Sequence, residues 1–575
     1  MKAECSRFGP VLEHGGTRFQ LWAPSAQKVA VIIDGRAPAA LRREGGGYWE
    51  LWCEAGPGSL YRFDVDGKIV ADPASRFQPA DAGGPSRVVD SAAYVWQTND
   101  WNGLPWEQAV LYEMHTGIEG GFAGVRSRLA ELVDLGVSAI ELMPIADFSG
   151  GRNWGYDGVL PFAPDSTYGE PNDLRALIDA AHAHGLMVIL DVVYNHFGPQ
   201  DNYLPAYAPE FFDEATPTPW GAAIDFHKPE VRRFFTENAL YWLEEFRFDG
   251  LRIDAVHAIS DRSWLTEMAA TVRARCSGRH IHLVAENEAN EACLLEAGID
   301  AQWNDDFHNA LHVILTGETH AYYRAFAERP AEKLARCLAE GFAYTGQPSP
   351  NHDNYPRGQP SAHLPVTAFV NFLQNHDQVG NRAFGERLTQ LARPAALRAA
   401  TALLLLCPQV PLLFMGEEYG AREPFLFFTN FDGQLAETVR AGRRQEFAAT
   451  PGFDSAADTQ AIPDPNEEAS FAASRYTRTA PDAGQWRARV RDLLALRRAR
   501  IVPFLNSTHA IGAEAIGDRA VRARWRLGAA GTLTVIANIG LVPVLATMPS
   551  SSPLFGAMPA NGCVPAECTV AWIVP

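Results

Sequence analysis

The segment GLRIDAVHAI, residues 250–259, is an apolar run typical of a buried β-strand, but it carries Arg252, Asp254 and His257. Charged side chains are rarely buried in a protein core unless they are paired. Arg252 and Asp254 are two residues apart, so in a strand both side chains point to the same face. Three interpretations follow: a structural ion pair, a metal site, or a catalytic site at the mouth of a barrel.

Seven further short apolar runs resemble this segment, and amphipathic helical patterns lie between them. We expect strands at 109–115, 138–145, 186–196, 250–259, 282–287, 300–304, 368–377 and 410–419. Residues 172–185 predict a helix with Asn172 as its cap, and residues 229–246 predict one with Pro229 in its first turn. Because the strands are apolar on both faces and alternate with helices, they predict an α/β fold, a (β/α)₈ TIM barrel.

The chain on either side of this region has a different pattern. Residues 1–95 alternate polar and apolar positions in short runs, which predicts an N-terminal β-sandwich. Residues 96–502 are assigned to the barrel, and short β runs return in residues 503–575, which predict a C-terminal β domain. The stretches 346–363 and 430–484 are expected to be long irregular loops.

Composition limits the possible partners. The chain has 575 residues and a formal net charge of -19, which argues against a nucleic-acid partner or an anionic membrane. It has no apolar leader or membrane-length apolar run, so we expect a cytoplasmic protein. The eight cysteines are scattered without a CxxC pair and predict neither a disulfide framework nor a zinc site; Cys563 and Cys568 are close together in sequence.

Carboxylates recur at the ends of the predicted strands. Asp254, Glu286 and Asp377 follow three different strands, and the carboxyl ends of barrel strands form one face. Such a set can hydrolyse a glycoside with retention of configuration. Asp254 suits the nucleophile because Arg252 favours its ionised form, Glu286 suits the acid/base, and Asp377 would stabilise positive charge at the anomeric carbon.

Metal binding is the competing use of these side chains. The histidines fit no HxxxH or HxH frame, so the sequence predicts no transition-metal site. Calcium stays open as an alternative, through Asn195 and nearby oxygens. We expect no cofactor.

Four segments carry a resemblance to a known family: DVVYNH (191–196), GLRIDAVHA (250–258), LVAEN (283–287) and FLQNHD (372–377). They resemble the four signature regions of the α-amylase clan, glycoside hydrolase family 13. The resemblance implies an N-terminal sandwich of carbohydrate-binding type and the same roles for the three carboxylates. It also implies a set of sugar contacts, with the first as an aromatic platform and His257 on the leaving-group side: Tyr156, His196, Arg252, His257, Trp303, Asp305, Asn375 and His376.

Further segments, including WGYDGVLPFAPDSTYGEPNDL (154–174) and QNHDQVGNRAFGERL (374–388), resemble the members of this clan that act on maltooligosyl trehalose. This implies hydrolysis of the α-1,4 bond next to the terminal trehalose unit, downstream of a synthase that makes the substrate. The segments TGIEGGF and ENEAN depart from the pattern of those members. A 1,4-α-glucan branching enzyme, a general α-glucanase and an inactive glycan-binding barrel stay as alternatives.

Overall fold

The computed structural model describes residues 6–575 apart from 219–220, 449–452 and 454. Its centre is a closed barrel of eight parallel strands in chain order, in which the last strand pairs with the first. All eight predicted strands are present, although each is shorter than predicted. Their bounds are β10 Leu111–Met114, β11 Ala139–Leu142, β14 Met187–Val192, β17 Gly250–Ile253, β18 His282–Ala285, β19 Ala301–Trp303, β22 Phe369–Phe372 and β23 Val410–Phe414.

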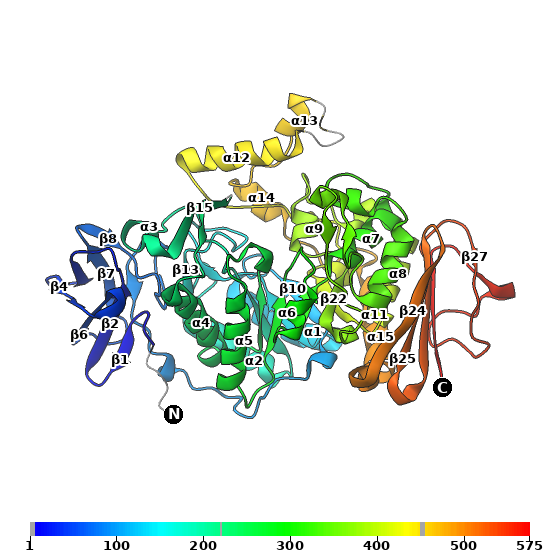
Figure 1. Cartoon of the computed structure of the whole chain (residues 1–575), viewed down its shortest axis with the longest axis horizontal. Helices are drawn as coiled ribbons and strands as arrows, with labels where there is room; N and C mark the ends of the chain where they lie inside the picture. The colour runs from blue at the N-terminus through cyan, green and yellow to red at the C-terminus, as the bar shows by residue number, and fades with distance from the viewer. Residues whose placement is uncertain (1–5, 219–220, 449–452, 454) are drawn as a thin grey trace.

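Amphipathic helices follow the strands and cover the barrel (Figure 1). They are α1 Gly121–Leu135, α2 Pro171–Ala183, α4 Pro229–Glu244, α5 Ser263–Arg275, α7 Asp305–Thr316, α8 Pro330–Glu340, α11 Pro394–Leu406 and α15 Ala483–Arg500. Pro229 is in the first turn of α4, as predicted. The prediction that Asn172 caps α2 is wrong: Glu170 is the cap, and it forms a capping box with Asp173.

The N-terminal strands form two antiparallel sheets, as predicted for a sandwich, at the blue end of Figure 1. Alternate residues of β3 and β7 are buried, so the sheet that contains these two strands has one face in the core and the other less buried. One sheet contains β1 Val11–Glu13, β2 Gly16–Trp22, β6 Tyr48–Cys53 and β5 Arg42–Arg43; the other contains β4 Ala39–Ala40, β3 Val29–Ile33, β7 Leu60–Val65, β8 Lys68–Val70 and β9 Ser86–Arg87.

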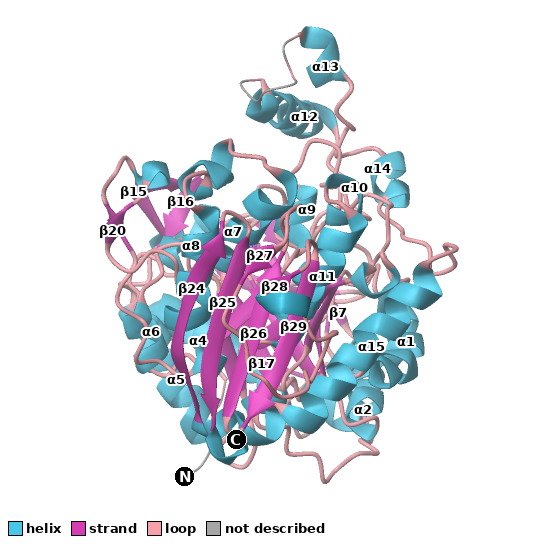
Figure 2. Cartoon of the chain, turned by 90° about the vertical axis from the view of Figure 1, so that its right-hand side faces the viewer, coloured by secondary structure: helices cyan, strands magenta, loops and turns pink. Residues whose placement is uncertain are grey.

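The C-terminal strands form a four-stranded antiparallel sheet that lies against α8 and α11 (Figure 2). The strands are β24 Thr508–Gly517, β25 Ala520–Leu527, β26 Thr532–Asn538 and β29 Cys568–Val574. Trp525, fully buried, donates a hydrogen bond from its indole to the carbonyl of Leu338 in α8 at 3.1 Å. A C-terminal β domain is therefore confirmed, whereas the boundaries predicted at 95/96 and 502/503 stay a prediction.

The stretch 430–484 is not the irregular loop that its sequence suggested. It contains α12 Gly433–Phe447, α13 Ala456–Gln460 and α14 Glu468–Ala473, and α12 and α13 project beyond the barrel in Figure 1. α12 buries only Ala436, Arg443 and Phe447, and its segment is rich in arginine and glutamate, so its sequence does not resemble that of a core-packed helix. The stretch 346–363 is irregular apart from β20 Gln347–Pro348, β21 Pro356–Arg357 and a turn at Pro350–His352.

Three two-stranded antiparallel sheets lie outside the main sheets: β12 Ala146–Asp147 with β13 Leu160–Pro164, β15 Phe212–Thr218 with β16 Gly221–Ile224, and β27 Val544–Leu545 with β28 Cys563–Val564. The short helices are α3 Leu204–Tyr207, α6 Ala292–Glu296, α9 His376–Gly380 and α10 Leu388–Leu391. Cys563 and Cys568 are both free thiols. Within the described ranges, no helix combines the length and apolarity that a bilayer crossing requires.

Candidate active site

The segment 250–259 changes direction immediately after its strand. β17 ends at Ile253, not at 259 as predicted, and Ala255 has a φ of 41°, in the left-handed region that only glycine adopts without strain. His257 therefore lies in the short turn Val256–Ala258 and not on the strand. The turn places Asp254 at the carboxyl end of β17, on the face where barrels of this kind carry their sites.

Arg252 is the centre of the site. Its side chain is fully buried, and Nη1 donates to Oδ1 of Asp254 at 2.8 Å and to both carboxylate oxygens of Asp191 at 2.8 and 2.9 Å. Nη2 donates to Oε2 of Glu286 at 2.9 Å. One guanidinium thus binds carboxylates from three consecutive barrel strands, and it lies over the ring of Trp303 at 4.1 Å from the centroid.

Asp254 is held ionised by its neighbours. Oδ2 accepts a hydrogen bond from Nδ2 of Asn195 at 2.8 Å, while Oδ1 faces Arg252. Burial alone would raise the pKa of Asp254, but the charges of Arg252 and His196, with these hydrogen bonds, outweigh burial and lower its pKa below the usual value. The carboxylate of Asp254 is therefore held as an anion.

Glu286 has the opposite protonation tendency. Its Oε2 accepts hydrogen bonds from Arg252 and from the backbone N–H of Ala255 at 2.8 Å. Burial raises the pKa of Glu286 well above its usual value, and although Arg252 opposes this, the charge of Asp254 raises the pKa further. When the pKa values of two neighbouring carboxyl groups are shifted in opposite directions, one group can be ionised while the other still carries its proton.

Asp377 lies in the first turn of α9, after β22, with about a third of its side chain exposed (34%). Asn375 caps this helix through a hydrogen bond from the N–H of Gln378 at 3.0 Å, which fixes the turn. Gln378 in turn donates to Oδ1 of Asp305 at 3.0 Å. Burial, and after it the charge of Asp377, raises the pKa of Asp305 to about 7.

Tyr156 and His376 form a stacked pair beside the carboxylates. Their ring centroids are 5.0 Å apart with an interplanar angle of 22°, and the Tyr156 hydroxyl donates to Oδ2 of Asp191 at 2.6 Å. The imidazole Nδ1 of His376 is hydrogen-bonded to Glu113. Burial lowers the pKa of His376, but the charges of Asp377 and Glu113 outweigh it and raise the pKa to about 9, so the ring is cationic at neutral pH.

The two other predicted histidines occupy different places. His196 is buried, and its Nε2 lies 2.9 Å from the carbonyl oxygen of Tyr156. Burial lowers its pKa, although Asp254 opposes the shift. His257 lies further out, where its Nδ1 accepts a hydrogen bond from the N–H of Glu288 at 3.4 Å. His196 therefore adjoins the carboxylates, and His257 adjoins the segment ENEAN.

Trp303 is deeper in the barrel than its predicted role suggests. Its side chain is 1% exposed, Arg252 covers one face of the ring, and Phe372 packs against it with centroids 5.6 Å apart. A tryptophan in this position supports the guanidinium from below and does not present a free face to a sugar. Asp305, the first residue of α7, follows β19, and Asn375, the cap of α9, follows β22.

Two residues of the site were not singled out by sequence reasoning. Glu113 on β10 binds His376, and Glu141 on β11 lies 1% exposed inside the barrel, where neither of its carboxylate oxygens has a hydrogen-bond partner among the described residues. Burial, and then the charge of Glu113, raises the pKa of Glu141 well above its usual value. The available signal was a lone glutamate within each of the apolar strands LYEM and AIEL.

The calcium alternative depended on Asn195. Its amide group instead binds Asp254, and its side-chain oxygen faces the ring of His196. Over the parts of the chain that the structure describes, no three or more His, Cys, Asp or Glu side chains are grouped for a metal ion.

Three family models match the chain, in the order of its three regions. Residues 7–76 match carbohydrate-binding module 48, described as an isoamylase N-terminal domain; residues 75–210 match the alpha amylase catalytic domain; and residues 508–572 match a domain of unknown function, DUF3459. These matches, the closed barrel and the carboxylates at its mouth define a glycoside hydrolase of the α-amylase family.

Individual relatives narrow the class. The chain is 41% identical over 500 residues to malto-oligosyltrehalose trehalohydrolase of Deinococcus radiodurans, covering 85% of this chain and 82% of the relative. It is also 41% identical to the enzyme of the same name from Arthrobacter ramosus over 84% of this chain and 87% of the relative. A crystal structure from Salmonella typhimurium, described as an alpha amylase, superposes with a TM-score of 0.94 at 43% identity and covers 100% of both chains. The chain belongs to the malto-oligosyltrehalose trehalohydrolase family.

Proposed function

We propose that the protein hydrolyses the α-1,4 glucosidic bond next to the terminal trehalose unit of maltooligosyl trehalose, with retention of configuration. The products are trehalose and a maltooligosaccharide shortened by that unit. One observation carries the proposal: Arg252 binds Asp254 and Glu286 at once, while their pKa values move in opposite directions. The names of the relatives at 41% identity support the substrate.

The proposed mechanism follows from this pair. Asp254 attacks the anomeric carbon as Glu286 gives its proton to the leaving glycosidic oxygen, so the C–O bond to trehalose breaks and a glycosyl ester forms. Glu286, now an anion, takes a proton from water, and the resulting hydroxide nucleophile displaces Asp254. Asp377 stabilises the positive charge at the anomeric carbon in both steps through contacts to the sugar.

The proposed sugar contacts surround these carboxylates. Tyr156 gives an aromatic face, and the cationic His376 behind it strengthens hydrogen bonds to sugar hydroxyls. Four further residues are proposed as sugar contacts at the mouth of the barrel: His196, Asn375, Asp305 and His257. We assign Trp303 an indirect part, because it supports Arg252 from below. A synthase that builds the trehalose end of the substrate is the partner reaction that this function requires.

The test is to give the purified protein maltotriosyl trehalose and maltopentaose in parallel and to identify the products by chromatography. We expect trehalose and maltotriose from the first substrate, with little cleavage of the second. Preferential cleavage of maltopentaose would indicate a general α-glucanase, and a change in the iodine stain of amylose without trehalose would indicate a branching enzyme. Proton NMR of the first product formed reports its anomeric configuration, and a β-anomer at the new reducing end would contradict retention.

A further inference from the structure

The helix α12 projects beyond the barrel in Figure 1, but one of its buried side chains contacts the active-site end of the fold. Nη2 of Arg443 donates to the carbonyl of Gly380 at 2.7 Å and to the carbonyl of Arg382 at 2.8 Å. Gly380 is the last residue of α9, and Asp377 lies in the first turn of the same helix. α12 is therefore hydrogen-bonded to the short helix that carries a proposed catalytic carboxylate.

Arg443 is held firmly in this position. The residue is 8% exposed, its guanidinium lies 4.8 Å from the ring centroid of Phe447 and 5.7 Å from that of Phe427, and Nη1 donates to Glu446 at 2.9 Å. Burying a guanidinium group is costly unless its donors are satisfied. Both of its terminal nitrogens are satisfied here, and one of them is used entirely on the chain at the end of α9.

The residue between the two carbonyls connects them to Asp377. Asn381 donates from its backbone N–H to the carbonyl of Asp377 at 2.9 Å, and its side-chain Nδ2 donates to Oδ1 of the same residue at 3.2 Å. Arg443 binds the carbonyls of the residues on either side of Asn381. A shift of this turn would therefore move the amide group that orients the carboxylate of Asp377.

α9 has only five residues, so it cannot fix its own end. The last carbonyl groups of a helix have no partner within the helix and depend on groups from outside. Gly380 also packs directly on Trp154, since a Cβ at this position would lie 2.1 Å from a ring carbon of the indole. The guanidinium of Arg382 binds Glu318 at 2.8 and 3.0 Å. Arg443 thus completes a set of contacts that fix the end of α9.

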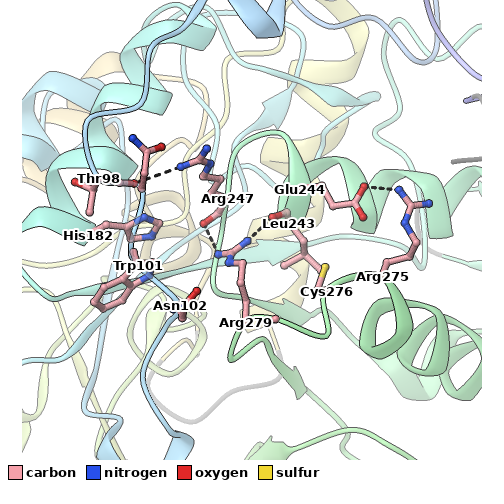
Figure 3. A pocket seen from close by; sticks show the side chains of 12 residues that line it. Thr98, Trp101, Asn102, His182, Leu243, Glu244, Arg247, Arg275, Cys276 and Arg279 are labelled. Carbon is pink, nitrogen blue, oxygen red and sulfur yellow. Dashed lines mark hydrogen bonds and ion pairs between the residues drawn. The ribbon is translucent and has the colours of Figure 1, made fainter. Parts of the chain in front are cut away.

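The same use of an arginine occurs before β17, at the other end of that strand from Asp254. Arg279 donates to the carbonyls of Leu243 and Arg247 at 2.7 and 2.8 Å, where the chain leaves α4 (Figure 3). In both places an arginine from a separate segment binds the carbonyl groups at the end of a helix. At α9, unlike at α4, the chain held in this way carries a carboxylate of the proposed active site.

We propose that Arg443 is a positioning residue of the active site, which fixes the turn 380–382 and, through Asn381, the carboxylate of Asp377. The inference rests on the proposed function, because it requires the role given there to Asp377. Arg443 itself does not touch the sugar. A misplaced carboxylate stabilises the transition state less, while the rest of the sugar-binding site is unchanged, so a loss of position should lower kcat more than it changes KM.

The test uses two variants of Arg443 in the full chain. Arg443→Met removes the donors but keeps a long apolar side chain beside Phe447, which still packs with Ala383 and Ile462 to hold α12. Arg443→Lys keeps a cation with fewer donors. The matched control is Arg440→Met on the same helix, because the Arg440 side chain is 35% exposed and binds Asp464.

The measurements are kcat, KM and melting temperature, with whichever of maltotriosyl trehalose and maltopentaose the wild type cleaves. In Arg443→Met we expect kcat to fall about 10- to 100-fold and KM to change less than about threefold. Arg443→Lys should lie between this variant and the wild type, and Arg440→Met should keep the wild-type kcat. Equal kcat values in Arg443→Met and the wild type, or equal losses in Arg443→Met and Arg440→Met, would overturn the inference.

A double-mutant cycle with Asp377→Asn separates positioning from general damage. If Arg443 acts through Asp377, adding Arg443→Met to Asp377→Asn should lower kcat by less than about twofold. The same fold loss in both backgrounds would show that Arg443 acts elsewhere. Wild-type activity in Asp377→Asn would refute the proposed role of Asp377 and this inference with it. Full activity in Arg443→Met beside an impaired Asp377→Asn would refute this inference alone.

Discussion

Nη1 of Arg252 lies 2.8 Å from Oδ1 of Asp254, while Nη2 of the same guanidinium lies 2.9 Å from Oε2 of Glu286. A cation shared by two carboxyl groups would ordinarily lower both pKa values. Here the pKa of Asp254 is lowered, because Asn195 and His196 add to the effect, and the pKa of Glu286 is raised, because its burial and the neighbouring anions prevail. The geometry therefore assigns different protonation states to neighbouring groups.

Asp254→Asn should abolish hydrolysis with little change in fold. The amide keeps the hydrogen-bonding shape but cannot act as a nucleophile, so we expect kcat to fall on the order of 10⁴-fold or more. The measurement is trehalose release from maltotriosyl trehalose. Asp492→Asn, at a position with 73% side-chain exposure, is the control and should retain full activity. Undiminished hydrolysis in Asp254→Asn would refute the proposed nucleophile.

Arg252→Lys should shift the whole pH profile upward. Lysine cannot reach Asp254 and Glu286 with two separate donors. Because Arg252 lowers the pKa of both carboxyl groups, a weaker cation should raise both. The acid limb of kcat/KM, which reports ionisation of Asp254, and the alkaline limb, which reports deprotonation of Glu286, should both move to higher pH.

A second variant separates this electrostatic effect from structural damage. Arg252→Met leaves three buried carboxyl groups without their shared cation, and we expect a loss of about 3–5 kcal/mol of stability. Arg252→Lys should lose less and remain folded. If the Arg252→Lys enzyme is folded and neither limb of its kcat/KM pH profile moves, Arg252 does not set the pKa values of Asp254 and Glu286.

Glu113→Gln should destabilise the protein in a pH-dependent way. Asp377 and Glu113 raise the pKa of His376 to about 9, so the ion pair contributes stability fully below the ordinary histidine pKa of 6.5 and loses it as the pH rises through 9. We expect a loss of about 1–3 kcal/mol at low pH and a smaller loss above the folded-state pKa. The measurement is the melting temperature of the wild type and of Glu113→Gln from below the ordinary histidine pKa to above the folded-state pKa of His376. An equal loss of stability at every pH would contradict an ion pair between Glu113 and His376.

Glu141→Gln should stabilise the protein, with the opposite pH dependence. The pKa of buried Glu141 is well above its usual 4.5, so the group costs stability once the pH exceeds the unfolded-state value, and the cost grows until the folded-state pKa is passed. The neutral amide avoids this cost. We expect a gain on the order of 1 kcal/mol at alkaline pH and none near pH 4. Glu113→Gln, on the neighbouring strand, is the contrasting variant, because Glu113 has a partner in His376.

The sequence predicted most of the barrel because each strand is short, apolar and bounded by polar residues. It overestimated the strand lengths. In GLRIDAVHAI the β-strand ends at Ile253, because Ala255 adopts a left-handed backbone conformation that turns the chain. A single residue in that conformation leaves no periodic pattern in the sequence. It missed α12 for a related reason, because that helix buries few side chains.

The chain by itself determined the alternation of strands and helices, the flanking β regions and the positions of Asp254, Glu286 and Asp377 at strand ends, because local periodicity and strand polarity are properties of the sequence. Only the tertiary structure decided what these groups touch. Closure of the barrel brings Arg252 to three carboxylates, places Trp303 beneath it and joins Glu113 to His376. It also buries Glu141, which has no hydrogen-bond partner in the described part of the chain. These contacts join residues up to 263 positions apart, and burial, which sets their pKa values, exists only after the sheet has closed.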